Sequence, residues 1–172
     1  DPYSTITQKK VCQVQNVQLS SQGAPIAVTT IKEEALVKRT QFRITIKNVG
    51  QGDVIKLESY EKCNPFGTEK LGREDIDKVR IEEVKIADTS LQCGPFIDGS
   101  SEGTNGYVRL INGEGTITCR LSSEQYANTN TAYTTPLKIR LSYLYKNTAE
   151  RKIQIKKEIR DLNRGAGTGI WT

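Results

Sequence analysis

The clearest pattern in this chain is an alternation of apolar and polar residues near its C-terminal end. From Leu137 to Tyr145 every second residue is apolar, and Lys138, Arg140 and Ser142 stand between them. A period of two is that of a strand with one face in the core and one in solvent. The sequence therefore predicts a strand here, with four residues in the core: Leu137, Ile139, Leu141 and Tyr143.

The alternation resumes after a polar break, KNTAE, which has the composition of a turn. Beyond the break, Ile153 and Ile155 are again separated by a single polar residue. We predict that these two isoleucines return to the core side. Residues 137–157 would then form the two strands of a closing hairpin.

Similar patterns recur upstream, with turn residues between them. Strands are predicted over residues 24–35 and 40–47, and the preceding Val- and Gln-rich segment favours an edge strand. Residues 107–121 are predicted to form a hairpin around Asn112-Gly113, because this residue pair is preferred in type I′ turns.

Residues 78–88 also alternate, but the phase of the alternation changes at Glu82-Glu83. A one-residue change of phase is typical of a β-bulge, which inserts one extra residue into a strand. The whole chain then contains about seven to nine short strands at regular spacing, with no long amphipathic helix. We therefore predict an all-β fold, an immunoglobulin-like antiparallel β-sandwich with extended N- and C-terminal segments. The predicted organisation is an N-terminal extension with an edge strand (1–23), a sandwich domain (24–157) and a C-terminal tail (158–172).

Composition excludes several classes of function. The 172 residues include no histidine, the commonest general base and transition-metal ligand, and the net charge is a modest +5. The basic residues are interspersed with acidic ones, so nucleic acid is not an expected partner. Asp75 and Asp77 lie in a charged run that is predicted to be a solvated face. The segment 98–103 lacks the spacing of an EF-hand loop. No enzyme activity, cofactor or metal is predicted.

Four cysteines are present: Cys12, Cys63, Cys93 and Cys119. No pair has CxxC spacing, so two disulfides in an exported protein are favoured over a zinc site of four separate thiolates. Four cysteines allow three connectivities. Cys93–Cys119 is favoured because it joins neighbouring segments, and Cys12–Cys63 would then tie the N-terminal extension to the body.

The segments APIAVTTIKEEA and TQFRITIKNVGQGDVI resemble the start of CARDB-like domains, which are immunoglobulin-like adhesion modules of archaeal and bacterial surface proteins. The shared features are a first strand and a second strand that ends in Asn48-Val49-Gly50-Gln51-Gly52, like the N-x-G corner of that family. Later segments are similar to those of exported archaeal proteins with the same sandwich character, and the resemblance covers roughly residues 24–157. It implies a sandwich on the outside of an archaeal cell. The four cysteines and the terminal extensions depart from the simple family pattern.

The only tryptophan, Trp171, stands on a glycine-rich tail beside Ile170. Glycines let a backbone run close to another surface, and tryptophan is enriched at interface hot spots. We predict an assembly interface on this tail, made of Gly165, Gly167, Gly169, Ile170 and Trp171. A flexible linker to a further domain is the other interpretation of the same residues.

Together these features predict a non-catalytic extracellular structural protein, a subunit of a surface filament or surface layer whose partners are other copies of itself. An upstream signal or anchor is expected, because the sequence has no methionine, and no segment is long and apolar enough to span a membrane. The alternative function is a cell-surface adhesion module that binds carbohydrate or protein. In that case Tyr126 and Tyr133, which flank a polar loop, would be candidates to stack on sugars.

Overall fold

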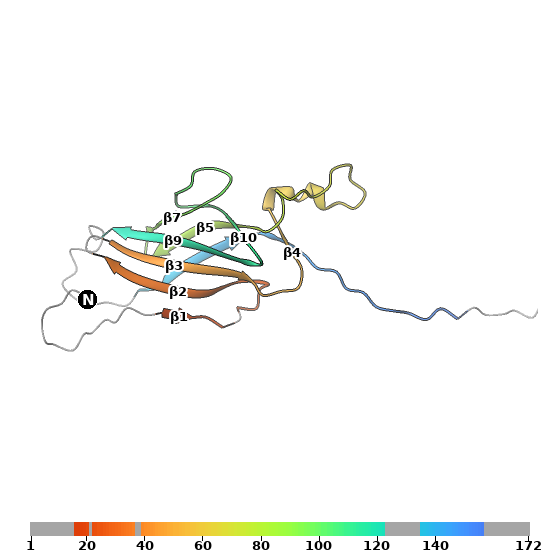
Figure 1. The fold of residues 1–172 in the computed structure, drawn as a ribbon, viewed down its shortest axis with the longest axis horizontal. Coiled ribbons are helices and arrows are strands. Elements are labelled where there is room, and N and C mark those ends of the chain that lie inside the picture. Colours follow the sequence, from red (N-terminus) through yellow and green to blue (C-terminus); the bar gives the residue numbers. More distant parts are fainter. Residues whose placement is uncertain (1–15, 21, 37–38, 123–134, 157–172) are drawn as a thin grey trace, which may run out of the picture.

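The computed structural model describes residues 16–20, 22–36, 39–122 and 135–156, and all regular structure beyond two short 3-10 turns is β-strand. The larger sheet has five antiparallel strands in the order β1-β2-β3-β9-β7 (Figure 1). Their bounds are β1 (Asn16–Gln18), β2 (Ile26–Leu36), β3 (Arg39–Asn48), β9 (Glu114–Ser122) and β7 (Gln92–Gly94).

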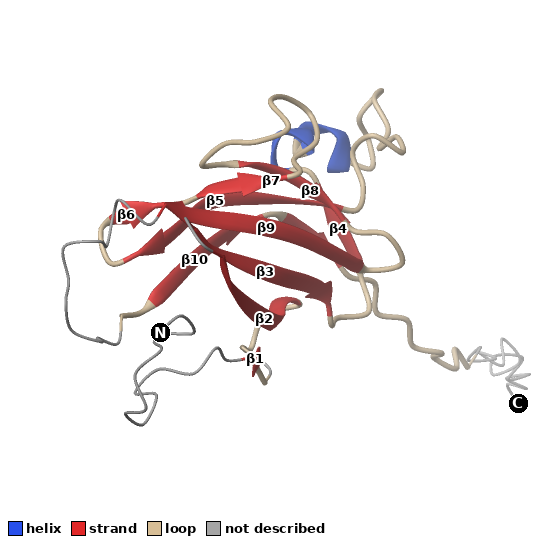
Figure 2. Ribbon diagram, turned by 60° about the vertical axis from the view of Figure 1, so that its left-hand side comes forward, coloured by secondary structure: helices blue, strands red, loops and turns tan. Residues whose placement is uncertain are grey.

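The second sheet has four strands and is built around β5 (Lys78–Ile86). One edge of β5 pairs with β10 (Leu137–Ser142), and its other edge pairs with β6 (Thr89–Ser90) and β8 (Gly106–Arg109). A separate two-stranded sheet joins β4 (Asp53–Ile55) to β11 (Leu144–Lys146). The 3-10 turns follow β4 at Leu57–Ser59 and Glu61–Cys63 (Figure 2).

The two large sheets share one core. β2, β3 and β9 of the five-stranded sheet contribute Ile26, Ile44 and Ile117, and β5 of the other sheet contributes Ile81 and Val84. All five side chains are buried, as expected where the inner faces of two sheets pack together. The predicted all-β antiparallel sandwich is therefore confirmed. Its immunoglobulin-like character stays a prediction.

The predicted bulge is present in β5. Arg140 of β10 lies opposite Glu83, while the next residue, Leu141, lies opposite Ile81. Glu82 is therefore the extra residue, and the strand keeps its apolar residues in the core on both sides of the bulge.

The turn at Asn112-Gly113 is also present, with both residues at positive φ of 53° and 79°. However, the predicted hairpin over residues 107–121 is wrong. The flanking strands separate directly after the bridge between Ile111 and Glu114, so that β8 pairs with β5 while β9 pairs with β3. The two strands separate because each has apolar residues to bury. β8 buries its apolar residues as part of the second sheet, and β9 buries its own as part of the larger sheet.

The predicted face of β10 is correct: Lys138 and Arg140 are exposed, and the apolar residues between them pack against the core while staying half-buried. The predicted closing hairpin is wrong. β11 pairs with β4, and Ile153 and Ile155 are 79% and 85% exposed instead of buried. The last strand in the described part of the chain ends at Lys146, before the predicted domain boundary at residue 157.

Candidate functional site

The disulfide predicted between Cys93 and Cys119 is formed. The two cysteines lie directly opposite each other on β7 and β9, with an S–S distance of 2.04 Å, and both are buried. Cys63 is an exposed free cysteine. Its predicted partner, Cys12, lies outside the described residues, so the pairing Cys12–Cys63 stays a prediction.

Two further groups of predicted site residues lie outside the described part of the chain. They are the tail residues Gly165, Gly167, Gly169, Ile170 and Trp171, and the loop tyrosines Tyr126 and Tyr133. The segment just before the tail is described, and it is the region from which a terminal interface would extend.

The corner formed by residues 48–52 contacts β11, the last described strand before the chain leaves the sandwich. The side chain of Asn48 donates a hydrogen bond to the carbonyl oxygen of Gly52 (2.9 Å) and accepts one from the N–H of Gly50 (3.1 Å). The N–H of Gly52 in turn donates to the hydroxyl oxygen of Tyr145 (2.6 Å). The corner thus fixes β11 against β4. No pattern in the sequence indicates this contact, because Gly52 and Tyr145 are far apart in the chain.

Residues 147–156 then run away from the sandwich as an extended segment (Figure 1). All ten residues are exposed, and no described strand pairs with them. Ile153 and Ile155 are among the most exposed large apolar side chains in the described part of the protein. The alternation of residues 151–156 is therefore the pattern of a strand that has no partner among the described strands.

The opposite feature, a strand edge without a partner, is found on β10. Its ladder to β5 occupies one edge, and within the described residues no strand pairs with the other edge. An exposed edge presents a row of unpaired N–H and C=O groups, which is a template for another strand. Sequence reasoning missed this edge because it assigned residues 151–157 to it.

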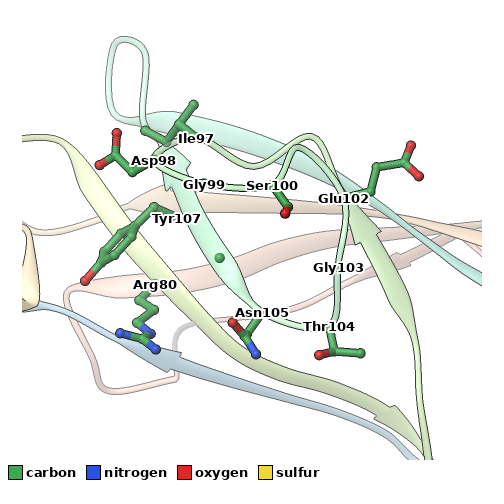
Figure 3. Close-up of a pocket in the computed structure, with 11 residues that line it drawn as sticks. Arg80, Ile97, Asp98, Gly99, Ser100, Glu102, Gly103, Thr104, Asn105 and Tyr107 are labelled. Carbon is green, nitrogen blue, oxygen red and sulfur yellow. The ribbon is translucent and has the colours of Figure 1, made fainter.

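A polar hollow of about 390 Å³ lies under the loop that joins β7 to β8 (Figure 3). Arg80 and Tyr107 form its floor on β5 and β8, and the loop supplies Asp98 and Asn105 at the rim. The remaining lining residues also come from this loop: Ile97, Gly99, Ser100, Glu102, Gly103, Thr104 and Gly106.

Two lysines neutralise the carboxylate of Asp98. The buried Lys78 donates a hydrogen bond to it, and Lys56 lies 3.3 Å away. The hydrogen bond from Lys78, together with the nearby charge of Lys56, holds the pKa of Asp98 below its usual range. Because this carboxylate is already paired, its first role is to let Lys78 be buried as a cation.

Glu58 and Tyr107 form a second group beside the hollow. Burial and the hydrogen bond that Tyr107 donates to Glu58 raise the pKa of the tyrosine to about 12. Burial also acts to raise the pKa of Glu58, but the bond from Tyr107 and the charges of Lys56 and Arg80 outweigh it, so the net shift is downward. Arg80 donates to the other carboxylate oxygen at 3.0 Å. The polar groups of this cluster are hydrogen-bonded or ion-paired with one another, as in a network that stabilises the fold.

The charged run predicted as a solvated face contains two buried charged residues, Lys78, described above, and Asp75. Asp75 is buried, accepts hydrogen bonds from Ser59 (2.6 Å) and from the N–H of Gly72 (2.8 Å), and pairs with Lys62 at 3.0 Å. The bond from Ser59, then the one from Gly72 and the charge of Lys62, lower the pKa of Asp75 to about 2. Asp75 therefore anchors the 3-10 turns and is not half of a carboxylate pair.

The described residues define the class of protein: an all-β protein of two facing antiparallel sheets, with a buried disulfide between Cys93 and Cys119 and with an outer edge of β10 that no described strand pairs. No helix in the described residues has the length and apolar character needed to cross a membrane. Comparison of the chain with protein-family models, with curated proteins and with solved structures gave no match. The resemblance to CARDB-like domains therefore stays a prediction.

Proposed function

We propose that this protein is a non-catalytic structural subunit of an extracellular surface filament or surface layer, in which copies join through their terminal segments. The observation that carries the proposal is the exposed segment 147–156. Its residues 151–156 have the alternation of a strand, the segment projects from the sandwich, and Ile153 and Ile155 are left in solvent. Exposed apolar residues in an extended segment favour association with another chain.

The buried disulfide supports the extracellular part of the proposal. Disulfides form and persist in oxidising compartments outside the cytosol, and Cys93–Cys119 joins two strands inside the core. The disulfide stabilises each copy of the protein by itself, whether or not that copy is bound to another.

Electron microscopy and light scattering of the purified full chain test the proposal. We expect concentration-dependent oligomers or filaments, and a chain that remains monomeric at every concentration would overturn it. Deleting Gly165–Thr172 measures the contribution of the tail. The sandwich is expected to keep its melting temperature, while assembly should weaken because Trp171 is lost. An unchanged assembly would assign the tail to a linker.

The polar hollow favours a second candidate, an adhesion module that binds carbohydrate. Asn105 and Ser100, which are both exposed, bring an amide and a hydroxyl to one concave surface (Figure 3). Such polar groups bind sugars by hydrogen bonds to their hydroxyls. The ring of Tyr107 does not add a stacking surface, because it is only 6% exposed and Lys56 and Arg80 lie over it. A glycan array tests this function, with Asn105→Ala as a variant that changes only an exposed rim residue. Equal array signals from both proteins would count against the hollow.

A further inference from the structure

The outer edge of β10 is a position at which the second sheet, as far as the described residues go, lacks a strand. We propose that Arg151–Lys156 of a second copy of this chain adds to that edge as a β-strand. This inference rests on the proposed function and names the surface that receives the terminal segment.

The strand order shows where the strand is missing. In the larger sheet the order β2-β3-β9-β7 corresponds to the order A-B-E-D of an immunoglobulin-like sandwich. In the second sheet β5 and β10 take the places of C and F. The place of strand G is the outer edge of β10, and within the described residues no strand occupies it.

The core is least covered at the same place. Most of the apolar residues that pack against the core but stay half-buried lie on β10 and in the residues after it, namely Leu137, Ile139, Leu141, Tyr143 and Tyr145. A strand at the outer edge of β10 would cover these side chains and also pair the free backbone groups. The site therefore needs a strand with apolar residues at every second position.

Arg151–Lys156 has the required pattern and length. Ile153 and Ile155 are two residues apart, which is also the spacing of Leu137, Ile139 and Leu141 along β10. In a paired sheet, residues on one face lie opposite residues on the same face of the neighbouring strand. The segment has as many residues as β10, which has six, so a continuous ladder is possible.

The path of the chain favours a second copy as the source of this strand. β11 is held on β4, and the segment after it leaves the sandwich without a hydrogen-bonded backbone turn between described residues of 147–156. Between described residues, this segment has a hydrogen bond from the N–H of Thr148 to the side chain of the adjacent Asn147 (2.9 Å), which does not tie it to the sandwich. Ten extended residues span up to about 35 Å, which is enough to reach a neighbouring sandwich.

Such a contact uses a different surface on each copy. The projecting segment of one subunit fills the β10 edge of the next, whose own segment stays available. Contacts of this heterologous kind continue from copy to copy and produce open chains unless the rotation closes a ring. The geometry thus agrees with a filament.

Charge opposes the contact on its solvent side. Lys152 and Lys156 of the added strand would face the same side as Lys138 and Arg140 of β10. Glu83 offsets part of this charge, because it lies 3.8 Å from Arg140. We therefore expect association to strengthen as salt screens the remaining repulsion.

The test uses three full-length variants. Ile153→Asp/Ile155→Asp removes the apolar residues of the added strand, and Ile139→Lys places an inward-pointing charge on the β10 edge, a feature that blocks strand addition. Ile111→Asp is the matched control, because Ile111 is 70% exposed on a different turn. Sedimentation should show that each of the first two variants associates at least about a hundredfold more weakly than the wild type. The control should associate as the wild type does.

Mixing supplies the decisive measurement. The double-Asp variant keeps an intact β10 edge, and Ile139→Lys keeps an intact segment, so their mixture should form one-to-one dimers although neither variant associates alone. Hydrogen exchange of the wild-type assembly should show protection at residues 137–142 and 151–156, and this readout does not depend on any variant folding. Mixtures that stay monomeric while both variants are folded would overturn the inference.

The remaining outcomes separate this inference from the proposed function. A wild-type chain that never associates contradicts both. A wild-type chain that assembles, with the double-Asp variant assembling equally well, contradicts only the β10 contact. A monomer in which residues 137–142 and 151–156 are both protected shows that the segment closes its own edge, which also overturns the inference.

Discussion

Removing the Cys93–Cys119 bridge is expected to destabilise the protein by about 3.5 kcal/mol, according to the chain-entropy relation for a closed loop. The two cysteines are separated by 26 residues, and this separation sets the loop length in that relation. For a domain of this size, such a loss lowers Tm by about 7–14 °C. The perturbation is the double variant Cys93→Ala/Cys119→Ala, with the reduced wild-type chain as a control that keeps both sulfur atoms.

The loss should also be uneven across the structure. β7 is an edge strand of three residues, and Cys93 exchanges backbone hydrogen bonds with Gly103 of the following loop, at 2.7 and 2.9 Å. Without the bridge, the amides of β7 and of residues 96–105 should exchange faster than those of β2 and β3. The loop over the polar hollow would then be the first region to open.

Urea unfolding of the oxidised, reduced and double-alanine proteins measures the total effect, and amide exchange locates it. A loss below about 1 kcal/mol would refute the loop-closure argument. Uniform exchange across all strands would refute the local one. Thiol titration of the unfolded, unreduced wild-type chain counts two thiols if Cys63 is free as in the structure, and none if the predicted bridge to Cys12 forms.

Three further predictions concern single residues. Leu141→Ala should lower the free energy of unfolding by about 2 kcal/mol, because the side chain is half-buried against the core. Arg140→Ala should lower it by less than about 0.5 kcal/mol, because Arg140 is exposed. The reverse order of Tm would show that the register of β10 is wrong. The pKa of Asp75 is lowered from 3.8 to about 2. The stability that its ionised carboxylate adds to the fold is therefore complete above pH 4 and is lost as the pH falls through about 2. Asp75→Asn should therefore destabilise by about 1.5–3 kcal/mol at pH 7 and hardly at all at pH 2, and a constant difference across this range would contradict the assignment. Gly52→Ala should lower the free energy of unfolding by about 1–3 kcal/mol, because the added Cβ would lie 2.2 Å from a backbone oxygen of β11. Gly103→Ala should change it little, since the atom nearest to its added Cβ is 3.6 Å away. Equal unfolding midpoints of the two variants would show that β11 shifts freely.

One part of the candidate site can be predicted from local sequence patterns, and the other part depends on contacts between segments far apart in the chain. Residues 151–156 could be recognised from the sequence as strand-forming, because alternation is a local property. The edge that lacks a strand could not be recognised, since an edge exists only once the neighbours of β10 are known. The burial of Asp75 was hidden for the same reason: its partners Ser59 and Lys62 lie in another segment, and a charged run alone is typical of solvent.

The sequence by itself determined the class of fold, the inward face of β10, the extra residue in β5, the turn at Asn112-Gly113 and the bridge Cys93–Cys119. Each of these follows from the period of side chains along a strand, from the backbone preference of two adjacent residues, or from the pairing of neighbouring segments. The tertiary structure alone decided that β8 pairs with β5, that β11 pairs with β4 and that no described strand pairs with the outer edge of β10. Backbone hydrogen bonds are the same for every strand, so the choice among partners depends on how all strands together fill two facing sheets, which no local pattern records.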